Sequence, residues 1–233
     1  MSEKVTYDVK DNGLTKYLTK SFIWVAAGLV VTALAAFLTL YTGLYQVIFS
    51  NWIALVVVTV LELGVVIIFS SRITKMSVGS AYACFFAYAA LTGVTFSVYG
   101  LIYETSTIYL AFGFTALLFI NMAIIGFFAK KDLSRFSSLF MAGLITLIVF
   151  SLLNVFWLHL EVLDTILCYA GIVLFLGITA WDVQKIKTNY YSTEGDISMM
   201  KKANIYGALT LYLDFINIFI RILQLLGRNR SNN

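Results

Sequence analysis

The stretch "LTLYLDFINIFIRILQ", residues 209–224, is apolar enough to lie in a membrane, yet it carries Asp214 and Arg221. A charged side chain in the hydrocarbon core costs about 2.5–3.5 kcal/mol on insertion scales, so such residues usually face a bundle interior or a water-filled cavity. The polar residues of the stretch recur every three or four positions, which places them on one face of a helix: Thr210, Asp214, Asn217, Arg221 and Gln224. We therefore expect a membrane helix whose polar face is turned away from lipid, toward other helices or water.

The whole chain has the composition of a membrane protein. Of its 233 residues, 61% are hydrophobic and only 12% are charged, whereas a soluble domain has about 25% charged residues. Seven apolar runs are close to the roughly 20 residues that a membrane span needs: 21–42, 51–70, 79–103, 107–129, 136–158, 163–182 and 205–226. We expect an all-α protein with a single seven-helix transmembrane domain at 21–227, an N-terminal tail at 1–20 and a C-terminal tail at 228–233.

The basic residues predict the orientation in the membrane. They cluster before the first run and after the second, fourth and sixth runs, whereas the alternate loops near 43–50, 104–106 and 159–162 contain no Lys or Arg. Because basic loops stay in the cytoplasm, we expect the N-terminus and the loop at 183–204 there. The pI of about 9.0 then reflects topology, and we expect no nucleic-acid partner. We expect the seventh run to cross the membrane because it is long enough, and Arg228 and Arg230 would then lie outside. A re-entrant run would return them to the cytoplasm.

Cysteine and histidine usage indicates neither a redox site nor a transition-metal site. Cys84 and Cys168 lie inside apolar runs, where a thiol is usually a packing residue. His159 is the only histidine and lies in a loop, which argues against zinc or iron sites built on imidazole. We expect no cofactor and no enzymatic activity.

Two aspartates on consecutive runs are the main candidates for a functional site. Asp182 lies near the cytoplasmic end of the sixth run and Asp214 lies within the seventh. Two carboxylates at close range cannot both ionise cheaply, so a close pair would share a proton. Once deprotonated, its oxygens would suit a transiently bound Ca²⁺. Glu62, in the second run, could add a third carboxylate or pair with Arg221. The simpler alternatives are that the polar face only joins helices by hydrogen bonds, and that Asp182 is merely hydrated.

Several motifs resemble one known family. "GITAWDVQKIK" (177–187) and "ALTLYLDFINIFIRILQLLG" (208–227) are similar to the C-terminal signature of the Bax inhibitor-1 family, also called transmembrane Bax-inhibitor-motif proteins. "LELGVVIIFS" (61–70), "LTGVTFSVYG" (91–100) and "STIYLAFGFTALLF" (106–119) resemble that family's second, third and fourth segments. The resemblance covers nearly all of 20–227.

The resemblance implies a fold and an activity. The fold would have six helices around a central seventh, and the activity would be a pH-sensitive calcium leak gated by two aspartates, here Asp182 and Asp214. Family members can also latch the gate with an arginine at the end of the second segment. Arg72 is the nearest candidate, but its spacing from Glu62 is one residue off, and one residue turns a helix by about 100°.

The other expectations concern supporting residues and location. Asn217 and Arg221 are, with Glu62 and Arg72, candidate supports of the gate. Trp181 stands where the family often has Tyr. The short tails and the ending "NRSNN" favour a multi-pass protein of a bacterial plasma membrane, or of the endoplasmic reticulum membrane in a eukaryote.

Other functions remain open. A carboxylate pair also serves a proton-coupled transporter, although we see no inverted repeats or broken helices. A regulatory protein that restrains another membrane protein, such as a protease, fits the sequence too. An intramembrane aspartyl protease is disfavoured because the second aspartate follows "LYL" rather than GxG and the chain has no proline, and a retinal protein because the seventh run has no lysine. Our expectation is a pH-sensitive calcium-permeable leak whose partners are the lipid bilayer, calcium and protons.

Overall fold

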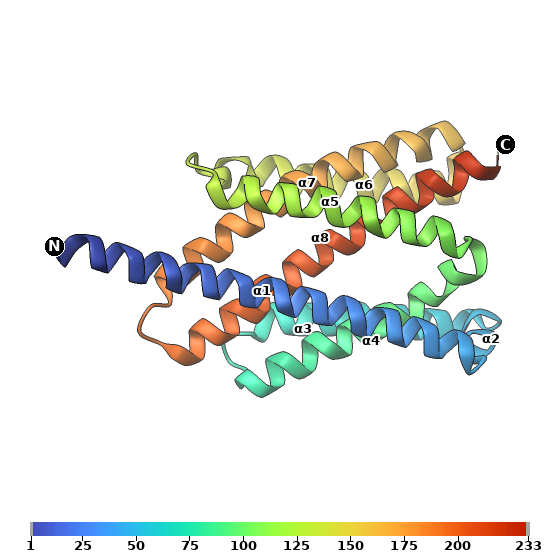
Figure 1. The fold of residues 1–233 in the computed structure, drawn as a ribbon. Coiled ribbons are helices and arrows are strands. Elements are labelled where there is room, and N and C mark those ends of the chain that lie inside the picture. The colour runs from blue at the N-terminus through green and yellow to red at the C-terminus, as the bar shows by residue number, and fades with distance from the viewer. Residues whose placement is uncertain (1, 232–233) are drawn as a thin grey trace. The chain divides into compact units, whose positions relative to one another are not determined.

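The computed structural model describes residues 2–231, with side chains described for residues 12–228. Within that range the chain is helical and contains no strand (Figure 1). The helices are α1 (Ser2–Tyr41), α2 (Leu44–Phe49), α3 (Trp52–Arg72), α4 (Val78–Ile102), α5 (Thr105–Phe128), a 3₁₀ turn η1 (Leu133–Phe136), α6 (Ser137–Leu153), a π-helical turn η2 (Asn154–Leu158), α7 (Glu161–Ser192) and α8 (Ile197–Ser231).

Seven helical segments of the described residues are long and apolar enough to cross a membrane. They are Asn12–Tyr41, Trp52–Arg72, Val78–Ile102, Thr105–Phe128, Leu133–Leu158, Glu161–Ser192 and Ile197–Arg228. Each contains most of one apolar run, so the predicted all-α membrane class with seven spans is confirmed. α7 and α8 extend well beyond their apolar runs because their polar ends continue the helix.

Local sequence explains where several helices end. Gly43, with φ of 73°, occupies the left-handed region at the turn between α1 and α2, and Gly195, with φ of 101°, does so between α7 and α8. Asn51 caps α3, because its side-chain oxygen accepts a hydrogen bond from the Ile53 amide at 2.9 Å.

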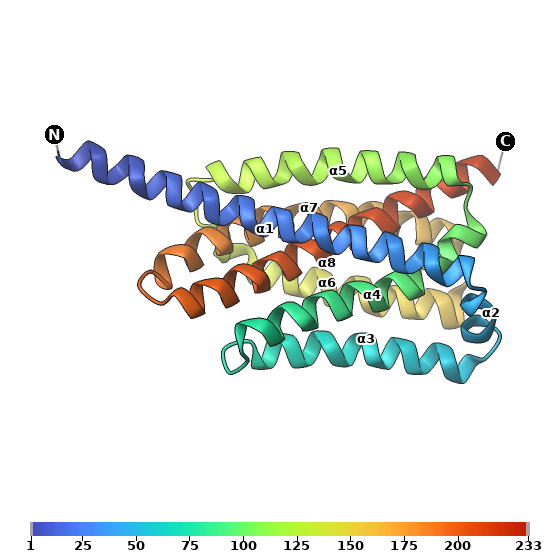
Figure 2. The same ribbon diagram turned by 60° about the horizontal axis from the view of Figure 1, so that its bottom comes forward.

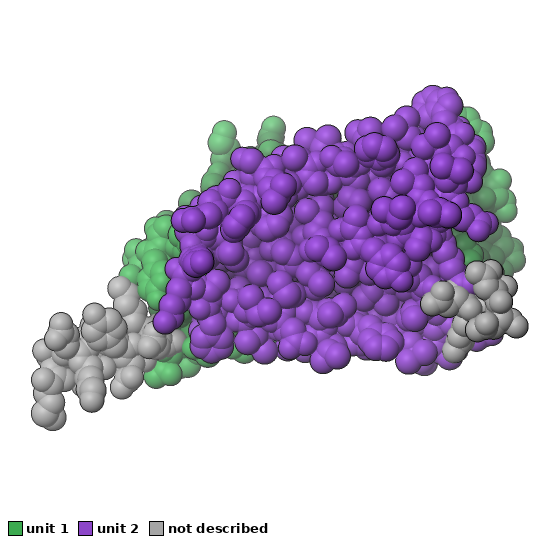
Figure 3. Space-filling view, turned by 90° about the horizontal axis from the view of Figure 1, so that it is seen from above, with its two compact units in different colours: residues 1–102, 186–212 green, residues 103–185, 213–233 purple. Residues whose placement is uncertain are grey.

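The helices form two compact units (Figure 3). Unit 1 comprises residues 1–102 and 186–212, and unit 2 comprises residues 103–185 and 213–233. α7 and α8 therefore each contribute one part to unit 1 and the other part to unit 2. The arrangement of six helices around a central seventh stays a prediction.

Unit 1 is built on α4, which packs against α1 and α3 (Figure 2). The contact with α1 is close, since a Cβ at Gly93 would overlap the Thr32 carbonyl oxygen. The Lys202 ammonium donates to the Thr74 carbonyl at 2.9 Å. This bond joins the α3–α4 loop to the start of α8, so these two basic segments lie at the same end of unit 1.

Unit 2 contains the close packing of α5 against α7, because a Cβ at Gly126 would lie 2.8 Å from Ala180 Cα. The Gln184 amide of α7 donates to the Lys131 carbonyl at 2.9 Å, and its oxygen accepts from the Leu133 amide at 2.7 Å. The basic α5–α6 loop therefore lies at the Lys185 end of α7, as the charge pattern predicts.

Candidate functional site

The two predicted aspartates come together in unit 2. Asp182 of α7 and Asp214 of α8 are both buried, with 3% of each residue exposed. Their carboxyl groups are close enough for the charges to interact, and the Thr179 hydroxyl lies beside Asp214. That hydroxyl also donates to the Phe175 carbonyl at 2.7 Å. Two carboxyl groups so placed can hold a proton between them or offer oxygen ligands to a cation.

A lysine that the sequence analysis did not single out is the counter-ion of this pair. Lys185 Nζ lies 2.6 Å from Asp182 Oδ1 as an ion pair, although the geometry is not that of a hydrogen bond. The ammonium also lies over the Trp181 ring, 3.9 Å from its centroid. The lysine side chain is 43% exposed, so it approaches the buried carboxyl from the edge of the unit. Lys185 could have been identified from the sequence, because it follows Asp182 by three residues and such residues are neighbours on a helix surface.

One carboxyl oxygen of Asp214 is without a hydrogen-bond partner among the described residues. This atom, Oδ2, is buried. A buried, unpaired carboxylate oxygen is costly, so this position favours a bound proton or a cation.

The rest of the polar face of α8 differs from position to position. The Asn217 amide donates to the Leu213 carbonyl of its own helix at 2.8 Å. The Arg221 guanidinium instead packs on Gly171 of α7 and interacts with the Cys168 thiol. Gln224, one turn after Arg221 on α8, accepts a hydrogen bond from the same thiol at 3.3 Å through its Oε1 atom. In unit 2 the outer part of this face is therefore directed at α7.

The C-terminal end of α8 carries a polar cluster that the sequence analysis missed. Arg228 contacts Asp164 Oδ2 and the Thr165 hydroxyl, at 2.7 and 2.9 Å. The Asn154 amide donates to Asp164 Oδ1 at 2.7 Å, and its oxygen accepts from the Leu160 amide at 2.9 Å. Since Asp164 lies in the first turn of α7, Arg228 lies at the end of unit 2 opposite Lys185. α8 is one uninterrupted helix that is long and apolar enough to cross a membrane, and the crossing itself stays a prediction.

A tyrosine beside this cluster shows the effect of its charge. Burial raises the pKa of the Tyr103 hydroxyl, and the positive charge of Arg228 partly offsets that effect. The Tyr103 ring also packs so closely on Gly227 that a Cβ there would overlap it.

The remaining candidates lie in unit 1. Glu62 Oε1 accepts a hydrogen bond from the Thr92 hydroxyl at 2.7 Å. Arg72 is exposed in the last turn of α3. Support of the gate by Glu62, Arg72, Asn217 and Arg221 stays a prediction.

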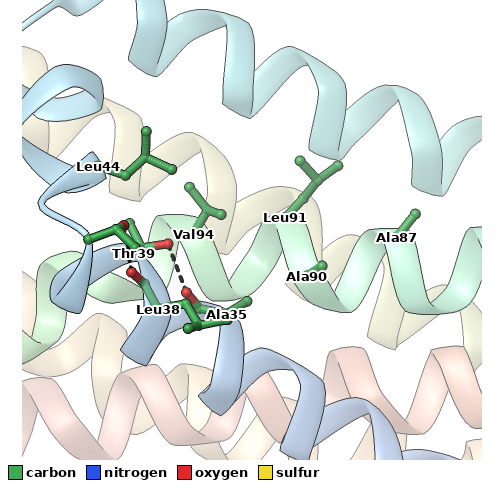
Figure 4. Close-up of a pocket in the computed structure, with 9 residues that line it drawn as sticks. Ala35, Leu38, Thr39, Leu44, Ala87, Ala90, Leu91 and Val94 are labelled. Carbon is green, nitrogen blue, oxygen red and sulfur yellow. Dashed lines mark hydrogen bonds between the residues drawn. The ribbon is translucent and has the colours of Figure 1, made fainter.

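The pocket described in unit 1 does not offer an alternative ion site. A pocket of about 600 Å³ in unit 1 is lined by α1, α2 and α4 (Figure 4). Its only polar residues are Thr39 and Thr42, whose hydroxyls bond to carbonyls of α1, so it suits no ion. Within the described residues no three His, Cys, Asp or Glu side chains come together as metal ligands. A Ca²⁺ at the aspartate pair would therefore need further oxygen ligands.

Comparisons with known proteins agree on one family. Residues 14–231 match the family model described as "Inhibitor of apoptosis-promoting Bax1". The chain is 36% identical over 220 residues to the inner membrane protein YbhL of Escherichia coli K12, which covers 94% of each chain. It is 32% identical over 232 residues to an uncharacterized membrane protein of Streptococcus pyogenes serotype M1, covering 98% of this chain and all of that one. With seven spans and this match over most of its length, the chain is a multi-pass integral membrane protein of the Bax inhibitor-1 family.

Proposed function

We propose that the protein is a pH-sensitive, calcium-permeable leak gated by Asp182 and Asp214. The observation that carries the proposal is the buried pair itself, in which Asp214 Oδ2 has no partner among the described residues. Asparagine would join helices at a lower cost than an ionisable carboxyl group does. A buried carboxylate pair is therefore expected where a change in its charge state has a function, such as opening a gate.

At low pH the pair holds one proton. Asp182 has the Lys185 ammonium beside it at 2.6 Å, and an adjacent cation favours the ionised form of a carboxyl group. The proton therefore resides mainly on Asp214. There it neutralises a buried carboxyl group whose Oδ2 has no hydrogen-bond partner among the described residues. In this state a single negative charge and a single positive charge balance, and the helices pack closely.

At higher pH the pair loses its proton. Two carboxylates then share one ammonium in a buried site, and their repulsion destabilises the closed packing. A divalent cation relieves the repulsion, and so does separation of α7 and α8 in unit 2. Lys185 is the group that an entering Ca²⁺ displaces, because it is half-exposed and already occupies the place of a cation beside Asp182.

Calcium flux into liposomes that contain the purified protein, measured from about pH 5 to 8, tests the proposal. A gate with one shared proton changes the flux by at most tenfold per pH unit. Asp182→Asn and Asp214→Asn keep the side-chain shape and should each flatten this dependence. Asp132→Asn is the matched control, because Asp132 is an exposed loop aspartate that caps η1 through Ser134.

Two outcomes would overturn the proposal. Wild-type liposomes that pass no calcium at any pH would exclude a leak and favour the regulatory role. If both variants passed calcium with the wild-type pH profile while Asp132→Asn did the same, the aspartate pair would be structural. Circular dichroism of each variant establishes that its helices are intact.

A further inference from the structure

A chain of hydroxyl groups runs through the core of unit 1 from Glu62. Thr92 of α4 donates to Glu62 Oε1 of α3 at 2.7 Å. Deeper in the unit, the Tyr212 hydroxyl of α8 lies 2.6 Å from Thr32 Oγ1 of α1. Thr32 in turn donates to the carbonyls of Gly28 and Ala89, at 2.9 and 3.0 Å. Four helices thus contribute to one row of polar groups.

The hydroxyl groups of the row are buried, whereas Glu62 at its start is half-buried. Tyr212, Thr92 and Thr32 are all buried, and a Cβ at Gly28 would meet the rings of Phe85 and Tyr212. Water therefore has little access to these hydroxyls, and each must find its hydrogen-bond partner within the row.

One contact in the row differs from the others. The Thr92 and Tyr212 hydroxyls are close enough to interact, whereas the contacts on either side of them are short hydrogen bonds of 2.7 and 2.6 Å. This contact lies between the part of the row that begins at Glu62 and the part that ends at the α1 and α4 carbonyls.

The supply of protons explains the difference. The row has four contacts: Glu62 with Thr92, Thr92 with Tyr212, Tyr212 with Thr32, and Thr32 with a carbonyl. An ionised Glu62 only accepts, as does a carbonyl, so the three hydroxyl protons can fill only three of the four contacts. A proton on Glu62 fills the fourth, because Glu62 can then donate to Thr92, Thr92 to Tyr212, and Tyr212 to Thr32.

We propose that Glu62 is a second proton-binding site of this protein, and that its protonation completes a hydrogen-bonded row through Thr92, Tyr212 and Thr32. The ligand is a proton, taken up as Glu62 carboxylate becomes carboxylic acid, and no bond other than O–H forms. The completed row ties α1, α3, α4 and the unit 1 part of α8 together. The site does not depend on calcium leakage.

Among the described residues of unit 1, the side chains that interact with Glu62 carry hydroxyl groups. Thr92 of α4 donates a hydrogen bond to the Glu62 carboxyl group, and the Thr95 hydroxyl, which donates to the Thr92 carbonyl at 2.9 Å, lies close enough to interact with it. Tyr88 of α4 and Tyr212 of α8 are the titratable side chains near it. Tyr88 also interacts with the Thr92 hydroxyl, which adds one contact and one proton and leaves the row one proton short as before.

Infrared spectroscopy tests the proposal without a calcium measurement. The C=O stretching band of a protonated carboxyl group is recorded for the purified protein in liposomes as the pH is lowered from about 9 to 4. Subtracting the spectra of Glu62→Gln isolates the band of Glu62. Tyr212→Phe removes two hydrogen bonds of the row from the protonated form, to Thr92 and to Thr32, but only the Thr32 bond from the ionised form. The protonated form therefore loses one hydrogen bond more, and the band should appear about 0.5–1 pH unit lower. Tyr206→Phe is the matched control, because Tyr206 lies on α8 against the Phe69 ring and outside the row.

A pH-dependent band that Glu62→Gln abolishes and Tyr212→Phe shifts supports the proposal. Wild-type and Glu62→Gln proteins with the same carboxyl bands at every pH would overturn it. Thr92→Val is the second variant, should Glu62→Gln fail to fold, since it removes the hydroxyl that contacts Glu62 and keeps the side-chain shape. If neither Thr92→Val nor Tyr212→Phe shifted any carboxyl band relative to Tyr206→Phe, the row would have no role in proton binding.

Discussion

Replacement of Lys185 by methionine removes the counter-ion of the proposed gate and keeps most of the side chain's length. The ammonium lies 2.6 Å from Asp182 Oδ1, with Asp182 buried and Lys185 43% exposed. Removal of one partner from a fully buried ion pair costs about 3–5 kcal/mol, whereas an exposed pair contributes about 0.2–1 kcal/mol. Because water screens the lysine but not the aspartate, we expect the ionised Asp182 to lose about 1–2 kcal/mol of stabilisation.

The sign of the effect follows from which form the ammonium favours. Lys185 stabilises the carboxylate of Asp182, so without it the aspartate pair keeps its shared proton up to a higher pH. A change of about 1.4 kcal/mol corresponds to one pH unit. The pH profile of calcium flux in Lys185→Met should therefore move upward by about one pH unit, and the leak at neutral pH should decrease.

The measurement is calcium flux against pH in liposomes, with Lys201→Met as the matched control. Lys201 is an exposed lysine near the start of α8, so the control removes one positive charge from a surface position. A profile for Lys185→Met that coincides with that of Lys201→Met would show that the ion pair does not govern the gate. A shift toward lower pH would refute the assigned order of protonation.

Two further predictions concern packing and the outer cluster. Gly126→Ala should lower the free energy of unfolding by about 1–3 kcal/mol, because the added methyl group meets the Ala180 backbone; Gly113→Ala on the same helix has nothing within 4 Å and should not lower it. Equal thermal midpoints for the two variants would contradict the close approach of α5 and α7. Arg228→Met should lower the free energy of local unfolding at this turn by about 1 kcal/mol, because Asp164 loses its ion pair and holds Asn154 less firmly. Hydrogen exchange of the Leu160 amide, which bonds to Asn154, should then be roughly fivefold faster. The Leu133 amide, held by Gln184, should exchange as before, and an unchanged Leu160 rate would show that Arg228 does not stabilise this turn.

The spans could be predicted from sequence because the bilayer fixes their length and composition. Each apolar run of about 20 residues lies mostly within one span. The basic loops also lie where their charge predicts, because Gln184 bonds to Lys131 in unit 2 and Lys202 bonds to Thr74 in unit 1. The polar face of α8 was predicted from its spacing alone. These properties follow from the hydrocarbon thickness and the helix period, which a single sequence displays directly.

The partners of the polar groups could not be predicted in the same way. Thr92 and Tyr212 are far apart in the sequence, and their proximity depends on how α4 and α8 are rotated within unit 1. Arg228 was placed in a tail because charge ended the apolar run, yet α8 continues to Ser231 and the guanidinium binds Asp164. Only Lys185 could have been identified from sequence, since it follows Asp182 by three residues on one helix.

Each of the two proposed proton-binding sites includes one residue of α8. Tyr212 ends the row from Glu62 in unit 1, and Asp214, two residues later, belongs to the aspartate pair in unit 2. Side chains two positions apart on an α-helix do not face each other, so neither site can exchange a hydrogen bond directly with the other through these two residues. Each proton instead fixes a different face of α8. Protonation of Glu62 secures the Tyr212 face, and protonation of the aspartate pair secures the Asp214 face. Acid should therefore strengthen the packing of α8 within each unit separately, and substitutions at one site should remove only the contribution of that site.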